Sequence, residues 1–202
     1  MEPLIDLDKK LLVYLNGFHA DWLDPVILQM TQTEFWIPLY LFLIYLIFRN
    51  YNSRAWLVLA GVALAILLAD QITSSLMKPF FARFRPSQEP TLKGLVHLIM
   101  KSDGTFYTGG LYGFASSHAA NSFATAMLMW LLFKDKYKWM VFIFVWAAGL
   151  TYTRIYLGVH YPGDILVGGI IGLLSGWAGY RFFRYLNTKV KFKTEDQLAE
   201  GD

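Results

Sequence analysis

The sequence has no cysteine among its 202 residues. Disulfide bonds, thiolate metal ligands and catalysis by a thiol are therefore excluded. Charge is also scarce, since charged residues make up 16% of the chain and the net charge is +3. The lysines and arginines form short clusters beside apolar stretches and no large basic face, so nucleic acid is not an expected partner.

The N-terminus lacks the basic start and the long apolar core of a secretory signal peptide. Asp6, Asp8 and Lys9 instead interrupt its apolar residues. Leucines recur there at helical spacing, at positions 4, 7, 11, 12 and 15. This pattern predicts a helix within 1–20 that either lies in the membrane interface or packs as a terminal helix.

Apolar side chains are what the sequence has in excess, with 55% hydrophobic and 17% aromatic residues. This composition is too apolar for an ordinary soluble domain and predicts a membrane protein. We therefore expect one all-α domain over 1–202, a polytopic membrane helical bundle with about five transmembrane helices plus an N-terminal interfacial helix. The expected spans cover 34–48, extended back toward residue 22, and 55–77, 117–133, 139–153 and 162–185.

Basic residues indicate the orientation, because short cytoplasmic loops retain Lys and Arg. They cluster at three places on one side of the expected bundle, namely Arg49 and Arg54, then Lys134, Lys136 and Lys138, then Arg181, Arg184, Lys189, Lys191 and Lys193. That side, with the polar tail over 187–202, should be cytoplasmic. Within the bundle core of 22–185, the loop over 78–116 and the connection over 154–164 then face outward.

Three short blocks at the outward face carry residue types used in phosphate chemistry. In the first block, six residues separate Lys78 from Arg85-Pro86, and the second block is Ala115-Ser116-Ser117-His118. In the third block, five residues separate Arg154 from His160, and three residues separate His160 from Asp164. Each block alone has an ordinary explanation, because cations anchor headgroups, a serine caps a helix and an aspartate suits a first helical turn. Their joint occurrence at one membrane face favours a site for phosphoryl transfer.

The cations of these blocks can bind a phosphate. Lys78, Arg85 and Arg154 can stabilise the charge on its equatorial oxygens without a metal ion. The backbone N–H groups near Ser117, at the start of the third expected span, add an anion site at a helix N-terminus.

The two histidines can divide the chemistry between them. His160 is the candidate nucleophile, because Asp164 lies one helical turn away and can bind one ring nitrogen while the other attacks phosphorus. His118 can then protonate the leaving oxygen and later activate water. These roles predict a phosphohistidine intermediate and a bell-shaped pH dependence.

Together, the three blocks resemble those of the type 2 phosphatidic acid phosphatases in order and internal spacing. The resemblance implies a metal-independent enzyme without a cofactor. It also implies that Lys78, Arg85, Ser116, Ser117 and Arg154 bind phosphate, that His160 attacks, that Asp164 orients it and that His118 is the acid. Bacterial membrane members of the family imply a multi-pass protein of the inner membrane, with the site facing the periplasm or the outside.

The sequence departs from the family pattern at three points. The usual Pro-Ser-Gly-His is Ala115-Ser116-Ser117-His118, so a serine side chain stands where the family has a glycine. Thr153 precedes Arg154 where serine is more usual. Many relatives also have six spans, whereas five are expected here.

The resemblance leaves the substrate open among several lipid phosphates and diphosphates. We rank undecaprenyl diphosphate first and a lipid A phosphatase activity close behind, followed by phosphatidic acid and phosphatidylglycerol phosphate. The loop over 87–114 should frame the headgroup and determine this choice. A lipid phosphotransferase and a non-enzymatic carrier of anionic lipids are the alternatives from other classes.

Three further features call for an interpretation. Asp70 lies inside an apolar span, where we favour a structural hydrogen bond to a neighbouring helix over a proton relay. His97 is interpreted as a surface residue and not as a third catalytic histidine. Gly168, Gly172 and Gly176 recur every fourth residue, which predicts close packing of another helix on that face.

Overall fold

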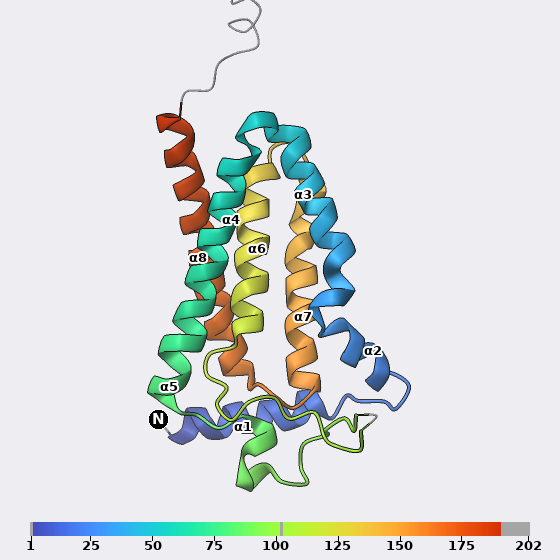
Figure 1. Ribbon diagram of the computed structural model, residues 1–202. Coiled ribbons are helices and arrows are strands. Elements are labelled where there is room, and N and C mark those ends of the chain that lie inside the picture. The colour runs from blue at the N-terminus through green and yellow to red at the C-terminus, as the bar shows by residue number, and fades with distance from the viewer. Residues whose placement is uncertain (1, 102, 191–202) are drawn as a thin grey trace, which may run out of the picture.

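The protein is described by a computed structural model that covers residues 2–101 and 103–190. Its described residues form helices and loops, as the sequence predicts. Five helices run side by side along the long axis of the molecule (Figure 1): α3 (Ile37–Tyr51), α4 (Ala55–Asp70), α6 (Ser117–Phe133), α7 (Ile143–Tyr156) and α8 (Pro162–Lys189). Three other helices gather at one end, namely α1 (Glu2–Asn16), α2 (Asp24–Met30) and α5 (Lys78–Phe81).

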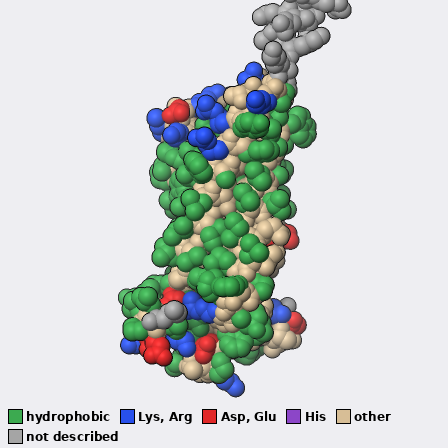
Figure 2. Space-filling view, turned by 90° about the vertical axis from the view of Figure 1, so that its left-hand side faces the viewer, with side chains coloured by type: hydrophobic (Ala, Val, Ile, Leu, Met, Phe, Trp, Pro, Cys, Tyr) green, Lys and Arg blue, Asp and Glu red, His purple; other side chains and the backbone are tan. Residues whose placement is uncertain are grey.

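Three helical runs are long and apolar enough to cross a membrane, namely Thr33–Phe81, Lys138–Tyr156 and Pro162–Lys189. The first has 49 residues and contains both α3 and α4, which fold back on each other at Asn52–Arg54. The predicted span over 117–133 coincides with α6. This helix has 17 residues, slightly fewer than the roughly 20 that a typical transmembrane helix needs. Apolar side chains cover the middle of the molecule, and charged side chains gather at its two ends (Figure 2). This surface is typical of a membrane-embedded bundle.

The first predicted span does not extend back to residue 22. Gln32 is extended, with φ −85° and ψ 141°, and this residue separates α2 from the short 3₁₀ turn that precedes α3. Pro25 and Pro38 lie in the first turns of α2 and α3, where their missing N–H groups are tolerated. At the other end of this hairpin, the helix predicted to stop at Lys78–Pro79 continues through a π-helical turn, Gln71–Met77, into α5. The predicted tail beyond residue 190 lies outside the described residues.

The glycines of α8 allow it to pack against α6 with the two backbones in contact. A Cβ added at Gly168, Gly172 or Gly176 would overlap a backbone carbonyl of Ser116, Ala120 or Ala124, which also recur every fourth residue. The close packing predicted from the glycine spacing is therefore present. Because α6 also packs against α4 and α7, it fixes the relative positions of the helix ends that carry the candidate residues.

Helix α1 lies across one end of the bundle (Figure 1) and contacts α7 and α8. Its inner face is held by Asn16, whose side-chain amide donates to the carbonyls of Ile155 and Tyr156. Its outer face exposes Leu4, Leu7 and Leu11. The loop between α5 and α6 covers the same end of the bundle, so α1 and this loop enclose the ends of α7 and α8.

Candidate active site

The three sequence blocks lie at the end of the bundle that α1 covers. Lys78 begins α5, Ser116 caps α6, Arg154 lies in the last turn of α7, and Asp164 lies in the first turn of α8. His160 belongs to the short connection between α7 and α8. Residues separated by more than 80 positions thus converge because α4, α6, α7 and α8 end at the same level.

His160 is buried, with 1% of its surface exposed, and each ring nitrogen has a partner. Nδ1 lies 3.3 Å from Asp164 Oδ2, and Nε2 lies 3.3 Å from Nη1 of Arg85. A guanidinium can only donate, so Nε2 accepts and Nδ1 carries the proton toward Asp164. The ring therefore holds its nucleophilic lone pair on Nε2, directed at a cation.

Asp164 is completely buried and fully hydrogen-bonded. Its Oδ2 accepts the backbone N–H of Tyr161 at 3.0 Å, and its Oδ1 accepts from Arg83 at 2.9 Å. The other end of the Arg83 guanidinium donates to Asp8 of α1 at 2.8 Å, and its Cζ atom lies 3.8 Å from the centre of the Tyr161 ring. Asp8 also accepts the backbone N–H of Gly163 at 2.8 Å. A chain of charges thus connects α1 to His160.

Sequence reasoning missed Arg83 and Asp8 as part of this site. A cation just beyond a span, such as Arg83, is typical of a headgroup anchor, and nothing near Asp8 in the sequence indicates a link to α8. The alternation of Arg83 and Arg85 around Phe84 is the one available signal, because alternate residues of an extended segment point to opposite sides. Arg85 reaches His160 while Arg83 reaches Asp164 from the other side.

The loop before α6 holds the two buried arginines. Arg85 donates to the carbonyls of Tyr112 at 3.1 Å and Val159 at 3.4 Å. Gly109, with φ +66°, leaves room for this guanidinium, because a Cβ there would lie 2.8 Å from Arg85 Nη1. Arg154 donates to the hydroxyl of Thr31 and, at 3.2 Å, to that of Tyr107, while its Nε is buried without a partner among the described residues.

At the start of α6, Ser116 and Ser117 take different roles. Ser116 is buried as the helix cap, and its Oγ lies 3.5 Å from the N–H of Ala119. Ser117 Oγ instead accepts from Lys78 Nζ at 2.7 Å. Lys78 is thereby held at the N-terminus of α6, where backbone N–H groups also favour an anion.

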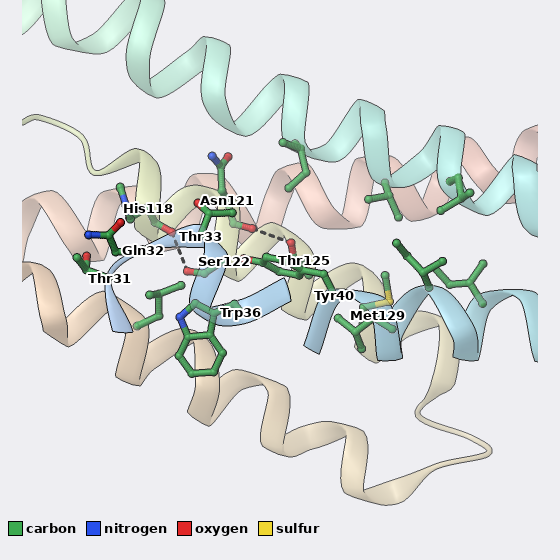
Figure 3. A pocket seen from close by; sticks show the side chains of 17 residues that line it. Thr31, Gln32, Thr33, Trp36, Tyr40, His118, Asn121, Ser122, Thr125 and Met129 are labelled. Carbon is green, nitrogen blue, oxygen red and sulfur yellow. Dashed lines mark hydrogen bonds between the residues drawn. The ribbon is translucent and has the colours of Figure 1, made fainter. Parts of the chain in front are cut away.

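His118 stands at the mouth of a cavity of about 450 Å³ that runs along α6 between α3 and α4. Thr31 and Gln32 lie beside it at that end, and Met129 lies at the far end (Figure 3). Apart from a few polar groups near His118, the lining is apolar. Thr31, which lines the same end of the cavity as His118, accepts a hydrogen bond from Arg154, so this end of the cavity lies beside the cationic cluster.

The electrostatics of the cluster suit a neutral nucleophile and an anionic ligand. Burial, together with the charges of Arg85 and Arg154, holds the pKa of His160 well below its ordinary value. Burial and the charge of Arg154 also lower the pKa of Arg85. Like charges held this close repel each other, so a phosphate with two negative charges would relieve the repulsion.

His97 lies apart from the cluster. Its Nε2 is 3.1 Å from the carboxylate of Asp24, and its ring stacks on His19 with 3.9 Å between centroids. Within residues 2–101 and 103–190, no group of three or more His, Asp or Glu side chains is arranged to hold a metal ion.

Comparison with known proteins identifies the family and agrees with the fold. The model of the PAP2 superfamily matches residues 54–188. The chain is 36% identical to the lipid A 4'-phosphatase of Bacteroides thetaiotaomicron, over 96% of this chain and 84% of that protein. It is 33% identical to the lipid A 4'-phosphatase of Porphyromonas gingivalis, over 94% of this chain and 78% of that one.

More distant relatives include the undecaprenyl-diphosphatase BcrC of Bacillus subtilis, 25% identical over 81% of this chain and 77% of that protein. Among solved structures, a transmembrane PAP2 type phosphatidylglycerolphosphate phosphatase from Bacillus subtilis superposes with a TM-score of 0.63. That likeness, at 23% identity, covers 96% of this chain and 90% of the other and supports the fold. The chain is thus a multi-pass membrane protein that belongs to the PAP2 superfamily, and within that family it is a lipid phosphatase, a phosphomonoester hydrolase.

Proposed function

We propose that this enzyme removes a phosphate monoester from an acylated glycolipid of the lipid A type. The ranking expected from the sequence, with undecaprenyl diphosphate first, is thereby reversed. The two lipid A 4'-phosphatases resemble the chain at 36% and 33% identity, compared with 25% for the undecaprenyl-diphosphatase. Undecaprenyl diphosphate remains the second candidate.

The observation that carries the proposal is the contact between the cationic cluster and the apolar cavity, where Arg154 donates to Thr31 beside His118. A phosphate placed among Lys78, Arg85 and Arg154 would lie near the His160 ring. The rest of the molecule could then extend past His118 into the cavity along α6. This arrangement suits a substrate whose phosphate is attached to a lipid.

The wall of the cavity next to His118 favours an acylated lipid over a polyprenyl chain. Asn121, Ser122 and Thr125 line it from α6 (Figure 3), and Asn121 Oδ1 is buried without a hydrogen-bond partner among the described residues. The Ser122 and Thr125 hydroxyls already donate to backbone carbonyls of α6, whereas a polyprenyl chain, being pure hydrocarbon, would leave the Asn121 oxygen unpaired, which costs free energy. Amide-linked or hydroxylated acyl chains could supply partners.

The proposed reaction begins when His160 Nε2 attacks phosphorus and the bond from phosphorus to the lipid oxygen breaks. Before this attack Arg85 must shift its N–H from Nε2 to a phosphoryl oxygen, which frees the lone pair, and Asp164 then stabilises the positive charge that develops on the ring. His118 donates a proton to the leaving lipid oxygen. In the second half, His118 takes a proton from water, which attacks phosphorus and releases orthophosphate and neutral His160.

The proposed membrane arrangement has α3, α4, α6, α7 and α8 as five spans and α1 as an interfacial helix. The exposed leucines of α1 support the interfacial position, because they would enter the acyl boundary while Asp8 faces the protein. Basic residues at the opposite end of the bundle support a cytoplasmic location for that end. The site then faces the periplasm or the outside.

A panel of lipid phosphates tests the proposed substrate class. Purified enzyme in detergent is given a lipid A bisphosphate, undecaprenyl diphosphate, phosphatidic acid and phosphatidylglycerol phosphate, and products are identified by mass spectrometry, with His160→Ala as the blank. We expect the highest kcat/KM with the lipid A bisphosphate. An equal or higher value with undecaprenyl diphosphate would overturn the assignment, and phosphate recovered on a second lipid would identify a phosphotransferase.

The pH dependence follows from the environment of His160. Because burial and neighbouring cations lower its pKa, the ring stays neutral until the pH falls well below histidine's ordinary 6.5. We therefore expect titration of His160 to leave kcat/KM unaffected between about pH 6.5 and 8. The enzyme should lose its neutral nucleophile, and kcat/KM should fall, only in more acidic solution. The measurement is kcat/KM for phosphate release from pH 4 to 9, and an acid limb with its midpoint at or above 6.5 would contradict the prediction.

A further inference from the structure

Ser117 occupies the position where this sequence departs from the family motif, and its hydroxyl is the centre of a hydrogen-bonded network. Lys78 Nζ donates to Ser117 Oγ across 2.7 Å. On the other side, Ser74 Oγ lies 2.8 Å and Thr73 Oγ1 lies 3.0 Å from the same oxygen. A glycine at this position would leave the ammonium without its shortest contact.

The chemistry of the groups determines which hydroxyl donates and which accepts in each hydrogen bond of this network. An ionised carboxylate only accepts, so the Ser74 hydroxyl donates to Asp70 Oδ1, at 3.1 Å. Ser117 must then donate to Ser74 Oγ, and its own oxygen remains free to accept from the Lys78 ammonium. Two hydroxyl groups thus connect a cation to a carboxylate inside an apolar helix.

The π-helical turn Gln71–Met77 provides this geometry. The backbone N–H of Lys78 bonds to the carbonyl of Thr73, five residues earlier, and such turns are frequent at functional sites. Ser74 contacts both Asp70 and Lys78, each four residues away, so all three lie on the face that meets α6. The hydrogen bond predicted from Asp70 to a neighbouring helix is not found among the described residues. Asp70 accepts from Ser74 of its own helical run, and Ser74 in turn contacts Ser117 of α6.

We propose that Asp70, Ser74 and Ser117 are positioning residues that hold the Lys78 ammonium at the start of α6. The inference rests on the proposed function, because it takes Lys78 as a residue that binds substrate phosphate. An ionised Asp70 would be costly in an apolar span without a compensating cation. In this arrangement the Ser117 side chain serves Lys78, while its backbone N–H remains at the helix N-terminus for phosphate.

Ser117→Ala tests the inference by removing the hydroxyl and retaining the backbone. We expect KM for the lipid phosphate, and the inhibition constant of inorganic phosphate, to rise about tenfold, while kcat changes less than about threefold. The dephosphorylated lipid is measured, so that added phosphate does not interfere. Ser117→Thr should recover part of the loss, because it restores a hydroxyl.

Ser75→Ala is the matched control, since Ser75 lies in the same π-helical turn but is exposed and bonds to Gln71. This variant should keep the wild-type KM and kcat. If Ser117→Ala leaves both KM and the phosphate inhibition constant within about twofold of wild type, the positioning role is refuted.

A double-mutant cycle separates a network from independent effects. Asp70→Asn alone should weaken phosphate binding, and adding it to Ser117→Ala should weaken binding by less than the product of the two changes. Ser74→Ala tests the same link without altering a charge inside the helix. Fully multiplicative effects would refute the network. The wild type and His160→Ala are measured in the same assay, so equal activity of those two would refute the proposed function, whereas an unresponsive Ser117→Ala refutes only this inference.

Discussion

Replacing His160 with alanine is expected to lower the rate of phosphate release by about 10⁴-fold or more, because the covalent route is lost with the nucleophile. Nε2 is the one ring nitrogen of this buried side chain that is free of a proton and directed at a cation. Single-turnover measurements with labelled substrate should also trap phosphate on His160 of the wild type and none on the variant. Residual release from the variant would reflect transition-state stabilisation by the cations alone.

Two further variants make this experiment specific. His19→Ala removes an exposed histidine ring that stacks on His97, and it should leave turnover unchanged. His160→Gln retains a polar side chain of similar length and should be as inactive as the alanine variant. Turnover above about one-hundredth of wild type in either His160 variant would mean that another group is the nucleophile.

Replacing Gly172 with valine is expected to separate α8 from α6 and thereby destabilise the whole bundle. A Cβ at this position would overlap the backbone carbonyl of Ala120, and a backbone cannot move aside as a flexible side chain can. Overpacking of this kind costs about 3 kcal/mol or more. Because α6 and α8 carry Ser117, His118 and Asp164, we expect phosphate release to be lost. The Tm of the variant, measured in detergent, should fall below that of the wild type.

Gly149 of α7 provides the matched control, because a Cβ added there meets nothing within 4 Å. Gly149→Val places the same β-branched residue in a neighbouring helix of the same bundle. Its Tm and phosphate release should stay close to those of the wild type. Equal Tm values for the two valine variants would contradict the packing argument.

Whether a contact could be predicted from the sequence depends on how far apart its two residues lie along the chain. The contact of His160 with Asp164 follows from a four-residue spacing that crosses the start of α8. The close packing of α8 follows from one repeated residue type. Both are local patterns, and both can be read without knowing the rest of the fold.

The rest of the site comes from contacts that no local pattern records. Arg83 reaches Asp8 and Asp164 across 75 and 81 residues. Tyr107 reaches Arg154 from a loop without regular structure.

The link from α1 to Asp164 has a practical consequence for handling the protein. Trimming the N-terminus beyond residue 8 leaves α3, α4, α6, α7 and α8 intact, yet it removes Asp8 and leaves Arg83 with Asp164 as its one recorded carboxylate contact among the described residues. The last turns of α8 lie at the far end of the molecule from this link (Figure 1). Affinity tags and reporter proteins therefore belong after α8, and a preparation shortened at its start can be well folded and nevertheless poorly active.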